Sequence, residues 1–489
     1  MSSIYGGTQE ERFSPRGART RSRNTATWKQ ILVSLFLLID LFLLYTIIMQ
    51  LTHQQKAFEA SKAVNLGLLA VFAVGASVLT WLVMRTDAWK RLLCMFLIFL
   101  ILYLSFAFSD LPFIKKYREI WISTAMSTMR HQGLATYFLP VKEVEQITKR
   151  EEEARGKQVG VNTVDTFTHD ADDHSNWSNP ENMQGLAVRE KTYFTLTPEQ
   201  QEFYMLFYEL NIDSAEAWFK EHPEALANGY SNIMINESSL ESEGTGIRTT
   251  LGEKVLAIDT QCQILIVEVD CDGSRGVLAI GKQPSRLGLY PSLNLPDWGQ
   301  TVGGIAKYHD GVLAMTGSGF IDEDGVGNGS LIAGWAKCHN GKTYGEHYNW
   351  GYKRLELHEN NWFYIEDAPS RVHPDTTDAM EFTPALIING EKLDPGDYTS
   401  QNPRACIGQS VRGEILMLCV EGRTIASPGC SVDICADVLL QHDGLTALNC
   451  DGGTTAILWY RGEPIIRCSN AAIPQGRYLP NAWVYVGDE

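Results

Sequence analysis

Two patterns of apolar residues divide the chain. Residues 31–49, 63–84 and 92–108 are nearly continuous apolar stretches, and each is close to the roughly 20 residues that a helix needs to cross a bilayer. From about residue 255, apolar residues recur at every second position between turn signals, which is typical of strands. We therefore expect an α+β chain, in which an N-terminal region of three transmembrane helices precedes a mixed, strand-dominated external globular domain.

Two of the three apolar stretches depart from an ideal span. The first contains Asp40 and the third is the shortest, so a re-entrant or imperfect span is the alternative for either of them. A transporter that uses the three helices as its pathway is a further alternative, but Asp40 is the only residue that supports it.

The positions of basic residues predict the orientation. Six Lys and Arg residues lie between residues 12 and 29, and three more lie between residues 85 and 91. Because cytoplasmic flanks are enriched in cations, we expect the N-terminus to be cytoplasmic and everything after residue 110 to be extracellular, in a multi-pass protein of the cell membrane. Three further cations between residues 115 and 118 oppose this orientation. The net charge of −17 argues against nucleic acid as a partner, whereas the lipid bilayer is an expected one.

Composition predicts four segments. They are a cytoplasmic tail (1–28), three transmembrane helices (29–109), a membrane-proximal region (110–250) and the strand-rich domain (251–489).

The membrane-proximal region is expected to be partly helical. Residues 117–137 have amphipathic helical spacing, whereas residues 142–189 are polar without long apolar runs, which predicts a linker or stalk. Two short helices should follow. Thr197 begins the first, and Asp213 with Glu216 forms a predicted capping box for the second.

The strand-rich domain shows hairpin and helix signals. Asp-Gly or Asn-Gly pairs begin at residues 272, 310, 340 and 389, and residues 386–393 are typical of a hairpin. Residues 431–442 predict a helix, because four apolar residues between 432 and 439 fall on one face. No internal repeat is evident, which argues against a propeller or solenoid.

Nine of the ten cysteines lie after residue 110, where disulfides can persist. Their spacing lacks the paired Cys-x-x-Cys of a zinc site. We therefore expect structural thiols or disulfides, with at least one thiol unpaired.

Residues 447–455, Ala-Leu-Asn-Cys-Asp-Gly-Gly-Thr-Thr, place a carboxylate at the end of an apolar strand. The two glycines after Asp451 allow the backbone to approach a ligand closely, and two threonine hydroxyls follow. An isolated Asp-Gly-Gly is more often a plain turn. However, Arg404 precedes the strand predicted at 405–408, and Glu421 and Arg423 lie at the end of the apolar strand predicted at 415–420. Paired arginines suit phosphate, and paired carboxylates suit acid, base or nucleophile roles, although surface salt bridges are the alternative.

The glycine-rich loop over residues 316–329 could bind an anion or a metal. Its spacing does not match an EF-hand, and it lacks the Walker lysine. We expect no metal and no cofactor.

Six ordered segments resemble the phosphodiester glycosidase family, which includes bacterial membrane proteins associated with exopolysaccharide. They are Lys-Gln-Pro-Ser-Arg at 282–286, the Gly-Phe-Ile-Asp loop ending at 322, Pro-Arg-Ala-Cys-Ile-Gly at 403–408, Glu-Gly-Arg at 421–423, Asn-Cys-Asp-Gly-Gly at 449–453, and the arginine at 477. The resemblance covers about residues 274–486.

The resemblance implies hydrolysis of the bond between a sugar's anomeric carbon and a phosphodiester oxygen. The implied catalytic residues are Asp451, Glu421 and Asp322. The implied substrate-binding residues are Arg404, Arg423, Thr454, Thr455, Arg286, Arg477 and Asn449.

The chain also departs from the family pattern. Residues 314–320 replace an Ile-Asn-Gly-Gly type of stretch, so an expected amide is missing, and Glu421 stands where an Asp is usual. Cys406 and Cys450 flank the proposed site, which indicates packing or a disulfide there.

Two hypotheses follow. In the first, the protein is a membrane-anchored extracellular glycosidase that hydrolyses sugar-1-phosphodiester linkages in surface polysaccharide or glycolipid, so that its partner is a phosphorylated carbohydrate or surface polymer. In the second, it is a non-catalytic carbohydrate-binding protein of the same fold, which acts in exopolysaccharide assembly or export with the corresponding machinery. The altered stretch at 316–320 favours the second.

Overall fold

The computed structural model describes most of the chain after residue 102. The described residues are 28, 35, 103, 105–128, 132–136, 138–164, 167, 169–173, 193–322, 327–348, 351–396 and 399–487. Nearly all of the predicted cytoplasmic tail and of the three predicted spans lies outside them. Within these ranges, no helix combines the length and the apolar character needed to cross a membrane.

The chain forms two compact units. The first comprises Met1–Arg118 and Gly133–Val144, and the second comprises Glu119–Gln132 and Glu145–Glu489. In the first unit, Arg118 pairs with Glu143 at 2.8 Å. The second unit holds every strand described below, and the boundary predicted at residue 250 falls inside it.

Seven α-helices lie in the described ranges. They are α4 (Pro112–Met126), α5 (Gly133–Thr136), α6 (Val141–Gln158), α7 (Pro198–Leu206), α8 (Ile212–Glu221), α9 (Val302–Tyr308) and α10 (Val432–Gln441). Helix α10 confirms the helix predicted at 431–442, with Ser431 as its N-cap.

Helix α6 corrects the prediction of a polar stalk over residues 142–189. The stalk was inferred from polarity, but the Lys, Glu, Gln and Arg residues of α6 are also good helix formers. After α6 the chain packs against the domain. The Thr163 amide donates to the Ile365 carbonyl at 2.9 Å, and the Phe167 ring stacks on Trp362 with centroids 4.2 Å apart. Residues 174–189 of the predicted stalk lie outside the described residues.

The N-caps of α7 and α8 were predicted with different success. Thr197 caps α7 as expected and forms a capping box with Gln200. The capping box predicted from Asp213 and Glu216 is wrong, because Asn211 caps α8 by accepting from the Ser214 amide at 2.9 Å. Glu216 instead accepts from the Tyr204 hydroxyl at 2.8 Å.

Nineteen strands form three sheets in the described part of the chain. They are β1 (Met234–Asn236), β2 (Lys254–Asp259), β3 (Ile264–Cys271), β4 (Ser274–Gly281), β5 (Leu287–Pro291), β6 (Gly311–Thr316), β7 (Trp335–Lys337), β8 (Thr343–Gly345), β9 (Lys353–His358), β10 (Phe363–Asp367), β11 (Thr376–Phe382), β12 (Ala385–Ile388), β13 (Glu391–Lys392), β14 (Arg404–Ser410), β15 (Ile415–Val420), β16 (Gly444–Asn449), β17 (Leu458–Tyr460), β18 (Glu463–Pro464) and β19 (Asn481–Val486).

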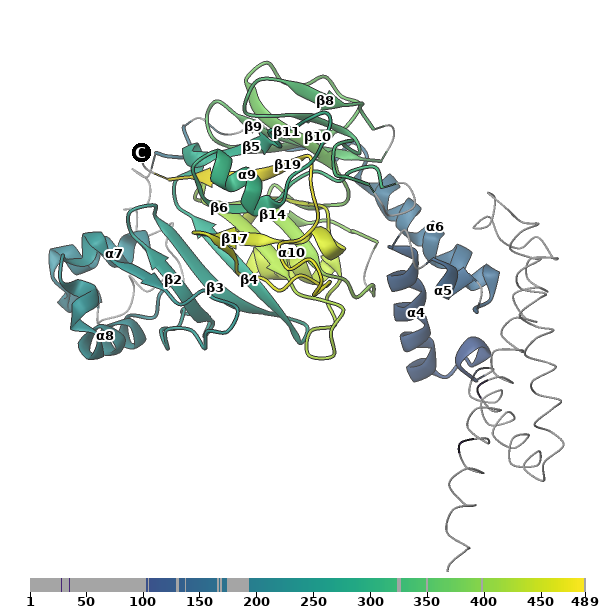
Figure 1. Cartoon of the computed structure of the whole chain (residues 1–489), viewed down its shortest axis with the longest axis horizontal. Coiled ribbons are helices and arrows are strands. Elements are labelled where there is room, and N and C mark those ends of the chain that lie inside the picture. Colours follow the sequence, from purple (N-terminus) through teal and green to yellow (C-terminus); the bar gives the residue numbers. More distant parts are fainter. Residues whose placement is uncertain are drawn as a thin grey trace, which may run out of the picture. The chain divides into compact units, whose positions relative to one another are not determined.

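The largest sheet has nine strands in the order β1-β2-β3-β4-β15-β14-β16-β12-β13. The other two have the orders β10-β9-β11-β7-β8 and β18-β17-β6-β19-β5. Figure 1 shows β2, β3 and β4 side by side, with α7 and α8 beside them. The architecture is therefore mixed and strand-rich, as predicted.

The predicted turns are only partly hairpins. The Asp-Gly turn at 272 joins β3 to β4, and the Asn-Gly turn at 389 joins β12 to β13. The Asp-Gly pair at 310 connects helix α9 to β6 instead. Its Asp310 has a φ of 53°, which a short polar side chain tolerates at the end of a helix as well as in a hairpin.

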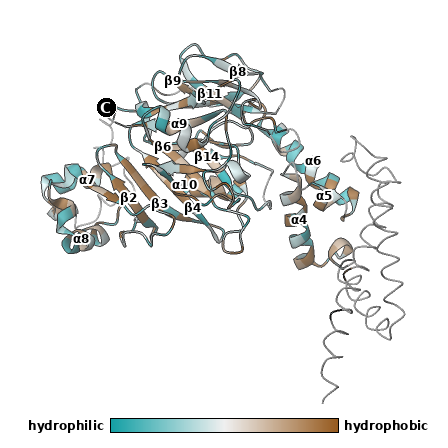
Figure 2. Cartoon of the chain, viewed as in Figure 1, coloured by the Kyte–Doolittle hydropathy of each residue, from teal (hydrophilic) through white to brown (hydrophobic). Residues whose placement is uncertain are grey.

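Alternation along the strands gives the nine-stranded sheet two apolar faces (Figure 2). On one face, Val255 and Leu265 pack with Phe203 and Phe207 of α7 and its C-terminal end, which confirms the apolar stripe of that helix. On the other face, neighbouring positions such as Ile266 pack into a second cluster with strands of the other sheets.

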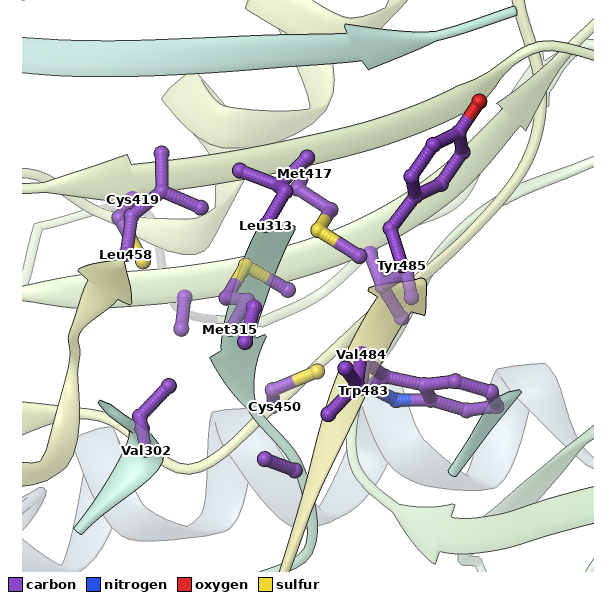
Figure 3. Packing of buried hydrophobic residues seen from close by; sticks show 14 of the residues in the cluster. Val302, Leu313, Met315, Met417, Cys419, Cys450, Leu458, Trp483, Val484 and Tyr485 are labelled. Carbon is purple, nitrogen blue, oxygen red and sulfur yellow. The ribbon is translucent and has the colours of Figure 1, made fainter. Parts of the chain in front are cut away.

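The nine cysteines from Cys262 to Cys468 are all buried free thiols. Cys450 packs in the second cluster, near Met315 and Trp483 (Figure 3). Of the two alternatives for Cys406 and Cys450, packing rather than a disulfide is therefore observed.

Candidate functional site

Asp451 lies just beyond the end of β16, which runs between β14 and β12 in the nine-stranded sheet. The Gly452 amide donates to its Oδ1 at 3.0 Å. At both glycines that follow Asp451, an added side chain would come too close to neighbouring atoms. A Cβ on Gly452 would lie 2.9 Å from the Pro403 carbonyl oxygen, and one on Gly453, whose φ is +72°, would lie 3.1 Å from Nη2 of Arg423. The Gly-Gly pair therefore brings Asp451 and Arg423 together.

A pocket of about 700 Å³ opens beside Asp451. This volume lies in the range of sites that hold a small organic ligand. Eight of the ten predicted site residues line it, namely Asp322, Arg404, Arg423, Asn449, Asp451, Thr454, Thr455 and Arg477. Residues from five separate stretches of the chain thus meet at one place.

Arg404 and Arg423 place two cations in the pocket wall. The side chain of Arg404, the first residue of β14, donates from Nε to the Cys430 carbonyl at 2.9 Å. Arg423 follows the neighbouring strand β15, and its Nη2 donates to Oδ1 of Asn402 at 3.4 Å. Burial and the nearby charge of Arg404 lower the pKa of Arg423.

No carboxylate in the described part of the chain pairs with Arg423. Arg423 is an exposed residue, so its positive charge is accessible to an anionic ligand at this region of the wall. Two arginines can also bind a phosphate through several hydrogen bonds.

Asp322 and Arg477 neutralise each other across the pocket. Arg477 donates from Nη1 to Oδ2 of Asp322 at 2.5 Å and from Nη2 to Oδ1 at 3.0 Å. The guanidinium also lies 4.7 Å from the ring centroid of Phe320. Asp322 is therefore an orienting partner of Arg477 in this structure, since both of its oxygens are engaged.

Asp451 has a strongly shifted acidity. Burial raises its pKa to about 6, against the opposing hydrogen bonds of Thr455 and Gly452. Arg477 lowers this pKa and Asp322 raises it, which shows that the ion pair lies within electrostatic reach. A carboxyl group that titrates near neutrality can exchange protons with a substrate or water at physiological pH.

Three smaller polar residues complete the strand end. Asn449 lines the pocket, and its amide nitrogen donates to the Thr383 carbonyl at 3.0 Å. The Thr455 hydroxyl donates to the Gly452 carbonyl at 2.6 Å and so supports the turn. The Thr454 hydroxyl has no hydrogen bond to any described residue, which leaves it available to a ligand.

Glu421 does not line the pocket. Its amide donates to the Arg275 carbonyl at 2.9 Å, and its carboxylate accepts from Nη1 of Arg275 at 2.8 Å. The pairing of β15 with β4 thus directs Glu421 into a structural ion pair. Sequence position at a strand end did not reveal this orientation.

Arg286 also lies away from the pocket lining. It belongs to a short 3-10 turn, Pro284–Arg286, and its Nη1 donates to the Val486 carbonyl at 3.4 Å. Its predicted role in substrate binding gains no support from this position.

The altered stretch at 314–320 mostly lies behind Asp451. Phe320 is its one residue that lines the pocket. Gly317 accepts from the Asp451 amide at 3.4 Å, and a Cβ on it would meet Oδ1 of Asn481 at 2.3 Å. Asn481 thus supplies a buried amide beside this stretch, at a position that the sequence pattern did not single out.

Sequence reasoning missed several residues of the pocket wall. Asn402 links Arg423 to Ser127, donating to the Ser127 hydroxyl at 2.8 Å across 275 positions of sequence. Glu151 and Arg155 of α6 line the pocket as well. No local pattern marks these residues, because their proximity is created by the fold.

The described residues contain no group of three His, Cys, Asp or Glu side chains arranged to hold a metal ion. Four residues of the glycine-rich loop, 323–326, lie outside the described ranges.

Residues 309–486 match the phosphodiester glycosidase family. This match confirms the resemblance found in the sequence. The phosphodiester glycosidase domain so defined contains Asp322, Arg404, Arg423, Asp451 and Arg477, and it excludes Arg286. It supports a glycosidase type of function.

Solved structures similar to the chain were also found. One is the catalytic domain of zebrafish N-acetylglucosamine-1-phosphodiester alpha-N-acetylglucosaminidase auto-inhibited by its pro-peptide, with 14% identity, a TM-score of 0.38, and coverage of 46% of this chain and 82% of that chain. A hypothetical protein from Synechocystis has 14% identity and a TM-score of 0.34, over 47% of this chain and 63% of that chain.

A third similar structure is a putative exported protein from Burkholderia pseudomallei K96243, with 11% identity, a TM-score of 0.31, and coverage of 47% of this chain and 77% of that chain. The comparison with curated proteins gave no match. The likeness to the phosphodiester glycosidase family therefore rests on the match over residues 309–486.

Proposed function

We propose that this protein is a membrane-anchored extracellular glycosidase that hydrolyses sugar-1-phosphodiester linkages in surface polysaccharide or glycolipid. The observation that carries the proposal is the convergence of Asp451, Arg404 and Arg423 on one pocket. An acid and two cations suit a substrate in which a sugar carbon is bonded to a phosphodiester oxygen.

In this proposal the two arginines bind the phosphodiester. Cleavage at the anomeric carbon releases a phosphate monoester, whose charge increases as the bond breaks. Fixed cations at the leaving oxygens stabilise that developing charge more than they stabilise the intact diester. Arg404 and Arg423 would therefore lower the barrier as well as bind substrate.

Asp451 is assigned the role of general base. A phosphate monoester has a second pKa near 6, so it can leave without receiving a proton from the enzyme. The attacking water does need to lose one. Asp451, with its pKa raised to about 6, is a stronger base than an ordinary aspartate and is ionised at neutral pH.

The remaining carboxylates are less suited to this role. Both oxygens of Asp322 are held by Arg477, and Glu421 is held by Arg275. In the proposed mechanism, Asp322 positions Arg477, and Glu421 stabilises the sheet.

The membrane anchor and the outer location rest on the sequence. Three apolar stretches of spanning length and the cations that flank the first two support them. The proposed partners are a phosphorylated carbohydrate or surface polymer, the lipid bilayer, and machinery of exopolysaccharide assembly.

A non-catalytic carbohydrate-binding role is the second candidate. It is favoured by the ion pairs of Asp322 with Arg477 and of Glu421 with Arg275, because Asp451 is then the one predicted catalytic acid that is not paired with an arginine in the described residues. Assay of the purified full-length chain against a chromogenic sugar-1-phosphodiester separates the two candidates. Turnover supports the enzyme, whereas binding without turnover supports the second candidate.

A further inference from the structure

Part of the pocket wall comes from helices outside the phosphodiester glycosidase domain. Ser127 and Thr128 directly follow α4, and Glu151 and Arg155 belong to α6. All four precede residue 309, where the family match begins. They can therefore give this chain a specificity that the matched domain alone does not define.

The end of α4 is attached to the pocket. The Gln401 amide donates to the Thr124 hydroxyl at 2.9 Å, and Asn402 donates to the Ser127 hydroxyl at 2.8 Å. Because Asn402 also accepts from Arg423, this wall is tied to the phosphate-binding arginines.

Arg155 is held in a defined position by an aromatic wall. Its guanidinium carbon lies 5.0 Å from the ring centroid of Tyr352, and that ring stacks on Tyr348 with centroids 3.9 Å apart. A Cβ on Gly351, whose φ is +85°, would lie 2.5 Å from the Arg155 side chain, so the aliphatic stem packs closely there.

The charge of Arg155 is not cancelled by an ion pair with any described carboxylate. Its contacts with Tyr352 and Gly351 are shared with neither Arg404 nor Arg423, so it occupies another part of the wall. Arg155 itself lines the pocket that contains Asp451, so it can contact a ligand held there.

We propose that Arg155 forms a subsite for a carboxylate on the sugar whose anomeric carbon is attacked, so that the substrate is a hexuronic acid 1-phosphodiester. This inference rests on the proposed function. A guanidinium matches a carboxylate with two parallel hydrogen bonds. Glu151 lines the same wall one turn earlier, and its charge repels a doubly charged phosphate more strongly than a singly charged carboxylate.

Matched ligands test the subsite without requiring turnover. Binding of glucose, galactose and mannose 1-phosphates to the full-length chain is measured by calorimetry, beside their uronic acid counterparts, which replace the terminal CH₂OH with a carboxylate. We expect the uronic acid of at least one pair to bind about tenfold more tightly, as for a charge-assisted pair. Arg155→Ala should abolish that gain in affinity. The affinity for the hexose 1-phosphate, which lacks the carboxylate, should stay unchanged.

Lys149→Ala is the matched control. Lys149 lies on the same helix, is 73% exposed and pairs with Glu153, so its loss removes one positive charge at a distance from the pocket. The gain should persist in this variant, and Arg155→Lys should keep part of it. Equal binding within every pair, or a gain that survives Arg155→Ala, would overturn the inference. Failure of all six ligands to bind would overturn the phosphate site as well, whereas turnover of a phosphodiester without a uronic acid preference would overturn the subsite alone.

Discussion

Arg477 holds both carboxylate oxygens of Asp322, with hydrogen bonds of 2.5 and 3.0 Å, at the wall of the pocket that contains Asp451. The pair adds no net charge to the pocket. Removal of the arginine would expose an uncompensated carboxylate to an anionic substrate.

This relationship predicts a non-additive pair of variants. Arg477→Ala should raise KM for a sugar-1-phosphodiester by about tenfold or more, because the freed Asp322 repels the phosphate. The double variant Asp322→Asn with Arg477→Ala should recover most of that loss. Steady-state kinetics of the two variants provides the test, and a double variant as poor as the single one would show that Arg477 itself binds substrate.

Arg423 and Arg286 form a matched pair of arginines, one inside the pocket and one outside it. Arg423→Ala should reduce kcat/KM by about 100-fold, in line with the loss of a charge-assisted contact to phosphate. Arg286→Ala should change kcat/KM by less than about twofold. Comparable losses in both variants would contradict the placement of the substrate beside Arg423.

The acidity of Asp451 predicts a pH dependence of activity. As a general base it must be ionised, so kcat/KM should rise with pH through about 6 and then level off. A phosphodiester does not titrate in this range, so the substrate adds no inflection. Glu151→Gln controls for the other acid of the pocket wall and should keep the inflection near 6. Activity that instead falls as pH rises through 6 would assign Asp451 as a proton donor.

The corrected cap of α8 makes a prediction about stability. Asn211→Ala should lower the free energy of unfolding by about 1 kcal/mol, because it removes the acceptor for the Ser214 amide. Asp213→Ala should lower the free energy of unfolding by only a few tenths of 1 kcal/mol in 0.5 M salt, because salt screens the interaction of Asp213 with the helix dipole. Denaturant titrations of the two variants are compared, and a larger cost at Asp213 would restore the predicted capping box.

Local signals explain which parts of the fold could be predicted. The strand at 415–420 is a continuous apolar run and the helix at 431–442 has a clear helical period, and both elements are present. The polar run at 142–189 has no apolar period, so helix α6 was missed although its residues favour helix formation. Polarity alone does not separate a stalk from an exposed helix.

The site residues could be predicted where charged side chains stand in a local motif or at the end of a predicted strand. The Asp-Gly-Gly motif and the arginines at strand ends marked Asp451, Arg404 and Arg423. Glu421 was misjudged, since a position at a strand end does not tell which neighbour will receive the side chain. Arg155 was missed because its approach to the pocket depends on contacts between segments about 200 residues apart, which no local pattern encodes.

Replacement of Asp451 tests the central claim most directly. Turnover of a chromogenic sugar-1-phosphodiester by the full-length chain is measured for the wild type, Asp451→Asn and Glu421→Gln. We predict that Asp451→Asn loses activity by about 100-fold or more while binding of a sugar 1-phosphate is kept, and that Glu421→Gln stays within about tenfold of the wild type once its thermal stability is taken into account. Undiminished turnover in Asp451→Asn would contradict the assignment of this pocket as the catalytic site.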